Sequence, residues 1–500
     1  MMEEKPNWMQ IPALRWLLPN LGSMVWCSIF LGGILLGPRM MNMDGDLGRH
    51  LTLGRDMLAS MRIPTADRYS HTMPGAPLTP HEWLSQVVFA LADQLVGLNG
   101  VVILTSLVLA TTFWLLFRLA VRRSSSIGFA LLFTIIGAGA SSLHWLTRPH
   151  IFTILFTTLW VIVLEDIFFG KSKRWWRLPL LMLFWVNFHG AFLIGGVLWL
   201  LYGAGMWWDR AAFDREDTPS SAAWRAYLLG GLSAAAATLL NPVGIRIWKT
   251  SIGFLSNRYL VSHTQEYLSP NFHQPNTWLF LFMIVLSILL TGAAAKRQRM
   301  TDLLAAGGWT AMALYSLRNL PIYVILAVPF LAKTAMDMFR SLPWKRWLER
   351  WEKWDSRWQR IEVNLRGFLL PGILFLGVWL ALAGGAKLDL DGKGNTFRED
   401  VFPVQAATWL SQHPPAGRMF NYFPWGGYLL YRLWDRQLVF IDGQTDFYGE
   451  EMTRKYEQII TLQDGWEGVL DAYRVEWAIL PADEPLSSAL KAGGWIELYQ

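Results

Sequence analysis

The stretch LGSMVWCSIFLGGILLGPRMM, residues Leu21–Met41, runs directly into Asn42-Met43-Asp44-Gly45-Asp46, and these residues decide how the rest of the chain is interpreted. The apolar part is long enough for one helical crossing of a bilayer, which takes about 20 residues. Asp44 and Asp46 then lie at the membrane surface, where carboxylates are costly unless they bind something or take part in chemistry. The stretch predicts a membrane protein with an acidic pair just outside its first helix.

The composition of the chain agrees with a membrane protein. Of its 500 residues, 53% are hydrophobic and 16% are charged, whereas soluble proteins carry about 25% charged residues. The single cysteine, Cys27, lies in the first expected helix, so the sequence contains no disulfide framework. A formal net charge of +6 is typical of basic cytoplasmic loops, and no nucleic acid is expected as a partner.

The apolar segments predict a polytopic all-α membrane protein with about 11 transmembrane helices. The expected spans are residues 21–41, 97–119, 127–145, 151–168, 178–188, 191–208, 226–240, 278–295, 302–317, 321–338 and 367–386. The basic clusters between them are Arg122-Arg123, Lys171–Arg177, Lys296–Arg299 and Arg340–Arg366. All four fall on one side only if residues 178–208 cross twice, with a turn at Asn187–Gly190. The positive-inside rule makes that side cytoplasmic, with the N-terminus inside and the C-terminus outside.

Two segments outside the expected spans have patterns of their own. Within residues 340–366, tryptophans recur every three or four positions among lysines and arginines, which is typical of an amphipathic helix at the cytoplasmic membrane interface. The strand-like stretches near the C-terminus are Arg418–Tyr422, Leu438–Asp442 and Trp477–Leu480. We therefore expect a transmembrane module, residues 1–386, with a long first external loop, 42–96, and a small extracytoplasmic α/β domain, 387–500.

This topology places most of the polar side chains near helix ends on the outer face. They are Asp44, Asp46, His50, Asp67, His81, Glu82, Arg148, His150, Asn187, His189, Glu266 and Arg318. Folding alone does not explain basic loops on one side and mixed acids, histidines and arginines on the other. Polar, non-helical backbone such as Asn187–Gly190 is tolerated at membrane depth only beside protein or a water-filled cavity. We infer a polar cavity that opens outward.

The order of these motifs resembles the GT-C superfamily of glycosyltransferases that use polyprenyl-phosphate sugars. This superfamily includes protein O-mannosyltransferases, aminoarabinose transferases and the catalytic subunit of oligosaccharyltransferase, and its acidic motif follows helix one. Within the superfamily the chain looks like a bacterial branch, and the resemblance covers nearly the whole chain. The segments that carry it are Asp44-Gly45-Asp46, His81-Glu82-Trp83, Trp185–Gly190, Asn241–Gly244, Arg318–Pro321 and Gly426–Tyr428.

The resemblance implies an enzyme of the bacterial inner membrane that takes a sugar from a polyprenyl-phosphate-linked donor. The acceptor is a glycan, a lipid or a protein on the periplasmic face. By analogy with the superfamily, Asp44 is the catalytic base, and Asp46 holds an acceptor hydroxyl or joins Asp44 in holding a divalent cation, Mg²⁺ or Mn²⁺. A carboxylate that titrates near neutrality suits removal of the acceptor proton. The alternative is that both are solvated loop acids that cap the following helix.

Further polar residues are candidates for binding the substrates. Arg148 and Arg318 are expected to bind the departing lipid phosphate, since guanidinium groups bind phosphate with paired donors; the alternative is snorkelling to the interface. The candidates for sugar or acceptor binding are His50, Asp67, His81, Glu82, His150, Asn187, His189 and Glu266. The structural alternatives are a helix cap for His81 and Glu82, helix-turn hydrogen bonds for His150, Asn187 and His189, and a plain surface position for Glu266.

Missing signatures narrow the function further. The sequence has no Gly-x-x-x-x-Gly-Lys-Ser/Thr loop, which argues against a nucleotide-driven pump, and no Cys-x-x-Cys or His-Glu-x-x-His zinc signature. The C-terminal domain lacks the Trp-Trp-Asp signature of oligosaccharyltransferase, so N-glycosylation is not supported. Two other functions stay open: a transporter or flippase of a polar lipid or solute, and a non-catalytic subunit of an envelope polysaccharide assembly system.

Overall fold

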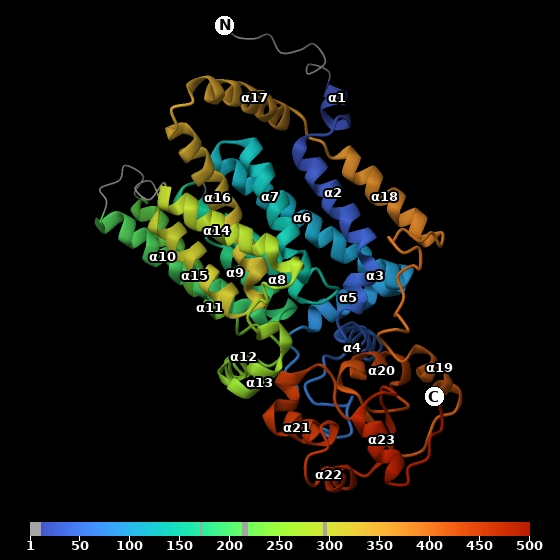
Figure 1. Ribbon diagram of the computed structural model, residues 1–500. Helices are drawn as coiled ribbons and strands as arrows, with labels where there is room; N and C mark the ends of the chain where they lie inside the picture. The colour runs from blue at the N-terminus through green and yellow to red at the C-terminus, as the bar shows by residue number, and fades with distance from the viewer. Residues whose placement is uncertain (1–11, 171–172, 213–218, 294–297) are drawn as a thin grey trace.

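The computed structural model describes residues 12–170, 173–212, 219–293 and 298–500. Its long helices form one bundle, and the residues that follow the last of them form a smaller domain at one end (Figure 1). Helix α17 (Lys345–Asn364) lies across the opposite end (Figure 1). These two ends are called the domain end and the α17 end below.

Each expected span corresponds to a helix of the bundle. These helices are α2 (Leu21–Leu35), α6 (Leu98–Ser124), α7 (Ile127–Ser141), α8 (His150–Phe168), α9 (Arg177–Phe188), α10 (Leu193–Ala212), α11 (Ser221–Ala237), α14 (Trp278–Ala293), α15 (Met300–Tyr315), α16 (Leu320–Ser341) and α18 (Leu369–Ala383). The core lies around α6 and α16, where Phe113, Leu116, Val324 and Phe330 are buried. The expected all-helical membrane fold is therefore confirmed.

Fewer helices meet the length and composition of a membrane span than the sequence predicts. Seven helices in the described part of the chain are long and apolar enough to span a membrane, or eight if the bent pair of α17 and α18 is one span. Helix α9 has only 12 residues, which is about 18 Å at 1.5 Å per residue. It stops because His189 has an extended backbone, at the turn expected from the sequence. The count of eleven is not confirmed.

The first loop, expected at residues 42–96, is about half helical. It contains α4 (Asp46–Ser60) and α5 (Trp83–Val96). Helix α4 buries Leu47 and Leu51, one turn apart, as an amphipathic helix does, but it also buries the polar residues Arg49, His50 and Asp56. Because buried polar residues lower the hydropathy of the segment, hydropathy alone does not reveal the helix.

The C-terminal domain is a small mixture of helices and strands, as expected. Its helices are α19 (Val404–Gln412), α20 (Gly426–Leu433), α21 (Thr445–Ile460), α22 (Trp466–Ala472) and α23 (Pro485–Ala492). Strands β1 (Arg418–Asn421) and β2 (Val475–Ile479) pair in parallel. In the strand-like stretch Leu438–Asp442, Val439 forms an isolated bridge with Ser70 of the first loop. This bridge connects the domain to the transmembrane module.

Glycines allow the domain to dock closely on α4. A Cβ atom on Gly427 would lie 2.3 Å from the carbonyl oxygen of Gly45, and one on Gly48 would lie 2.5 Å from the carbonyl oxygen of Gly427. Both distances are shorter than side chains tolerate, so α20 and α4 reach this separation only without side chains. The Gly426–Tyr428 segment therefore has a packing role beside the loop that carries the acidic pair.

Candidate active site

The polar groups at the domain end converge on one guanidinium. Arg148 lies between α7 and α8, and its Nη1 is 2.6 Å from Oδ2 of Asp44 while its Nη2 is 2.6 Å from Oδ2 of Asp46. Arg148 also pairs with Glu266 of the short helix η4 (Gln265–Tyr267). Three carboxylates from two segments thus share one buried cation.

The backbone around Gly45 directs both aspartates to the same point. Helix α3 (Gly37–Asn42) ends just before them, and Asp46 is the first residue of α4. The backbone N–H of Asp46 donates to Oδ1 of Asp44 at 2.8 Å, which leaves Oδ2 of Asp44 for Arg148. Asp44 is only 17% exposed. The two aspartates are therefore paired with a cation and not solvated loop acids.

Burial and the surrounding charges set the proton affinities of this group. Burial raises the pKa of Asp44 to about 7; the charge of Arg148 opposes the rise, and the carboxylates of Asp46 and Glu266 add to it. Burial also raises the pKa of Glu266, but Arg148 and Arg318 outweigh it and hold that pKa below its ordinary value. One carboxylate of the cluster can thus exchange a proton near neutral pH while another stays ionised.

Arg318 is the second cation of the site and is more accessible. Its Nη1 lies 3.3 Å from Oε2 of Glu266 and donates to the Tyr267 hydroxyl at 3.1 Å, and its Nη2 lies 3.5 Å from Nε2 of His189. Its side chain is 31% exposed, whereas that of Arg148 is 18% exposed. Glu266 therefore links the two guanidiniums, of which Arg318 is more open to solvent.

Glu82 gathers histidines beside the arginines. Its carboxylate lies 3.5 Å from Nε2 of His189, 3.8 Å from Nδ1 of His50 and 3.9 Å from Nε2 of His81. Burial raises the pKa of Glu82, although His81 and Arg148 oppose the rise. Burial and the charge of Arg318 lower the pKa of His189 and so favour its neutral ring. Glu82 caps no helix with its side chain, so it is oriented toward the histidines.

Three residues predicted to bind substrate are hydrogen-bonded to other parts of the protein. Asp67 accepts from the backbone N–H groups of Tyr69 and Ser70 in a turn of the first loop. The ring of His150 bonds the carbonyl of residue 144 at 2.7 Å. The amide of Asn187 donates to the carbonyls of residues 183 and 240 and accepts from the indole of Trp83. A substrate contact for these three residues remains a prediction.

The C-terminal domain contributes residues that the sequence analysis did not select. Asp442 Oδ1 lies 3.3 Å from Nε of Arg49, and Gln444 also bonds this guanidinium. Asp446 Oδ2 lies 3.6 Å from Nδ1 of His81. Asp442, Gly443 and Gln444 directly follow an extended apolar run, a signal of the same kind as Asp44-Gly45-Asp46. The domain therefore forms one wall of the site.

In this structure the positive charge beside the acidic pair comes from Arg148. The oxygens of Asp44, Asp46 and Glu266 that face one another are each already bonded to Arg148. Within the described ranges, no group of three or more His, Cys, Asp or Glu side chains is placed to hold a metal ion. The geometry is that of an acidic pocket for a guanidinium, and a divalent cation held by Asp44 and Asp46 remains a prediction.

No protein-family model and no curated protein sequence matches the chain, but solved structures do. The oligosaccharyltransferase of Archaeoglobus fulgidus, tethered to an acceptor peptide containing the NVT sequon, aligns with a TM-score of 0.60 and 12% identity over 92% of this chain and 68% of that chain. The archaeal oligosaccharyltransferase from the same organism, in complex with an inhibitory peptide and a dolichol-phosphate, aligns with a TM-score of 0.59 and 11% identity over the same shares.

A third structure, ArnT from Cupriavidus metallidurans bound to undecaprenyl phosphate, covers 94% of this chain and 90% of that chain at 14% identity. Its TM-score of 0.45 supports no argument. Identities of 11% and 12% with the archaeal enzymes show a shared fold and not a shared reaction. The GT-C fold expected from the sequence is confirmed.

Proposed function

We propose that the chain is a membrane glycosyltransferase that moves a sugar from a polyprenyl-phosphate-linked donor to a hydroxyl group of an acceptor. The observation that carries the proposal is a carboxylate with a pKa of about 7, Asp44, joined through Arg148 and Glu266 to the accessible guanidinium of Arg318. General bases work best when their pKa lies near the working pH. A departing phosphate needs fixed positive charge, and the two requirements meet here within a GT-C fold.

In the proposed reaction, Asp44 takes the proton of the acceptor hydroxyl. The oxygen of that hydroxyl forms a bond to the anomeric carbon of the sugar. The bond from that carbon to the phosphate oxygen breaks, and polyprenyl phosphate leaves with the electron pair. Arg318 stabilises the leaving phosphate, because its exposed guanidinium can make paired bonds to phosphate oxygens. Arg148, whose bonds go to three carboxylates, holds Asp44 and Asp46 in place.

An apolar groove between α9 and α11 offers a place for the isoprenoid chain. It has a volume of about 590 Å³ and includes Leu183 and Leu240 in its lining. The carbonyls of both residues accept from the amide of Asn187. Asn187 lies two residues before His189, so the groove ends close to the Glu82 and Arg318 groups. A lipid tail in this groove would bring its phosphate to the site.

The basic loops give the proposed orientation. The α17 end would face the cytoplasm of a bacterium, by the positive-inside rule, and the domain end would face the periplasm. The acceptor, a glycan, a lipid or a protein, would then enter from the side of the C-terminal domain. Asp442 and Asp446 of that domain lie beside Arg49 and His81, so the domain can both cover the site and contact the acceptor.

The test is turnover of polyprenyl-phosphate sugars by the purified protein in nanodiscs. Wild type is compared with the Asp44→Asn variant, and with Asp391→Asn, whose carboxylate is 58% exposed on the domain end, as the matched control. We expect donor hydrolysis or transfer in wild type and in the control, and a loss of about 10²–10⁴-fold in Asp44→Asn. Donor binding without turnover in all three proteins would instead support a lipid carrier or flippase.

A further inference from the structure

A second buried charge cluster lies at the α17 end, far from Asp44. Arg299, at the start of α15, has Nη2 3.0 Å from Oε1 of Glu165 and Nε 3.1 Å from Oδ2 of Asp302. Arg123, near the end of α6, pairs with the same two carboxylates. Two guanidiniums and two carboxylates from three helices thus form a closed network that locks these helix ends together.

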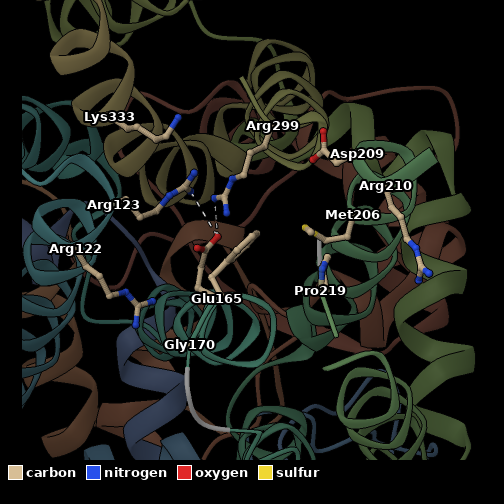
Figure 2. Close-up of a pocket in the computed structure, with 11 residues that line it drawn as sticks. Arg122, Arg123, Glu165, Gly170, Met206, Asp209, Arg210, Pro219, Arg299 and Lys333 are labelled. Carbon is tan, nitrogen blue, oxygen red and sulfur yellow. Dashed lines mark hydrogen bonds and ion pairs between the residues drawn. The ribbon is translucent and has the colours of Figure 1, made fainter. Parts of the chain in front are cut away.

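A cavity of about 350 Å³ opens beside this network. Besides Arg123 and Arg299, its cationic lining includes Arg122, Arg210 and Lys333. Figure 2 shows Arg123 and Arg299 both directed to Glu165, with Met206 and Pro219 across the open space. The wall formed by Arg123 and Arg299 is therefore polar, and the facing side combines Met206 and Pro219 with the charged residues Asp209 and Arg210.

The arginines around this cavity keep hydrogen-bond donors for an added group. Each guanidinium carries five N–H donors. Among the described residues, Arg122 donates through Nη1 to Asp166, and Arg299 uses Nε and Nη2. Arg210 forms no ion pair with any of the described residues. A phosphate is the ligand that matches several guanidiniums with spare donors, because its oxygens accept paired bonds.

The cavity also has features of a site for an amphiphile. Phe169 in its lining is 39% exposed, and the tryptophans that follow Met206, Trp207 and Trp208, are 62% and 48% exposed on the outer surface of α10. Exposed tryptophans favour the depth of lipid headgroups. A phosphate that is joined to an acyl chain would pair with the arginines and also contact the apolar side chains Phe169, Met206 and Pro219 of the lining.

We propose that this cavity binds the phosphate of an anionic phospholipid headgroup from the leaflet at the α17 end. The ligand would be a phosphodiester with apolar chains, and it would brace α6, α10 and α15 at the end opposite to the catalytic cluster. The proposal does not depend on the glycosyltransferase activity, because neither Asp44 nor Arg318 takes part in it. A soluble phosphorylated compound has the same recognition chemistry and is the other source to be tested.

The test measures thermal unfolding of the purified protein in uncharged detergent. The added probes are phosphatidylglycerol, phosphatidylcholine or inorganic phosphate. The variant is Arg122→Gln/Arg210→Gln, which leaves the buried network intact. The control is Lys345→Gln/Arg346→Gln, which removes two exposed charges from α17 at the same end of the bundle. Each variant is compared with its own lipid-free unfolding temperature, so a general loss of stability does not affect the result.

We expect phosphatidylglycerol to stabilise wild type and the control equally, at a half-saturating concentration that rises roughly 30-fold in the double arginine variant. Equal stabilisation by phosphatidylcholine, or an equal loss in the α17 control, would overturn the proposal. If inorganic phosphate stabilises the protein as much as phosphatidylglycerol does, the lipid is not the source of the phosphate. The site would then be assigned to a soluble phosphate compound.

Discussion

Arg148 Nη1 lies 2.6 Å from Oδ2 of Asp44, and this ion pair joins the turn after α3 to the turn before α8. The same guanidinium also pairs with Asp46 and Glu266. Because Asp44 is buried, the charge of its carboxylate depends on Arg148 and on the two neighbouring acids. A change of charge at any of these three neighbours should therefore move the pKa of Asp44.

The first prediction concerns the pH dependence of turnover. If Asp44 is the base, the rate should rise with pH through an apparent pKa near 7, because only the ionised carboxylate accepts the proton. Glu266→Gln removes a negative neighbour and frees Arg148 to act more strongly on Asp44, so the rising limb should move to lower pH. A rate profile from pH 5 to 9 for both proteins checks this, and an unmoved limb in Glu266→Gln would contradict the coupling.

The second prediction concerns stability. The folded pKa of Asp44, about 7, lies above the ordinary value of 3.8, so the folded state binds more protons than the unfolded state between these values. Stability from this group is therefore present below about pH 4 and is lost as pH rises to about 7. We expect Asp44→Asn to unfold at a higher temperature than wild type at pH 8, with a smaller difference at pH 5. Unfolding temperatures of both proteins across this pH range show whether the substitution stabilises the fold.

The third prediction tests the docking of the C-terminal domain. Gly427→Ala would place a Cβ atom 2.3 Å from the carbonyl oxygen of Gly45, which should push α20 away from α4 at a cost of about 1–3 kcal/mol. The matched control is Gly307→Ala in α15, where nothing lies within 4 Å of the new Cβ and helix propensity favours alanine by about 1 kcal/mol. The unfolding temperature should therefore fall in Gly427→Ala and not in Gly307→Ala.

Turnover separates a docking role from a purely local one for the same glycine. The backbone beside Gly427 contacts the loop that carries Asp44, so Gly427→Ala should also lower turnover at temperatures where the protein is still folded. Gly307→Ala should leave turnover unchanged. Full turnover in a destabilised Gly427→Ala protein would mean that the position of the domain does not influence the acidic pair.

Hydropathy predicts the long helices of the bundle but not α4, whose buried polar residues lower its hydropathy. Helix ends on one side of a membrane share a plane, so Asp44, Arg148, Glu266 and Arg318 could be grouped before their distances were known. The ion pair of Arg49 could not be predicted in this way. Its partner Asp442 lies in a domain whose docking depends on backbone contact at Gly427, and such contact has no periodic signal in the sequence.

The fourth prediction concerns metal ions. In Arg148→Gln the carboxylates of Asp44, Asp46 and Glu266 lose their common cation, and three oxygens that faced one guanidinium become available as hard ligands. We expect this variant to bind Mn²⁺, seen as a rise in unfolding temperature and a change in the Mn²⁺ electron paramagnetic resonance signal. Wild type should show neither effect, because Arg148 supplies the positive charge. Arg148→Lys, which retains a cation, is the matched control and should behave as wild type.

Turnover of the wild-type protein with and without metal ions can contradict this prediction. If the guanidinium serves as the cation of the site, turnover should be the same with a chelator and with added Mg²⁺ or Mn²⁺. A wild-type protein that binds Mn²⁺ and loses turnover in the chelator would show that Arg148 moves aside for a metal during the reaction. In that case the acidic pair would act as metal ligands, and Arg148→Gln should then bind Mn²⁺ more tightly than wild type and retain turnover.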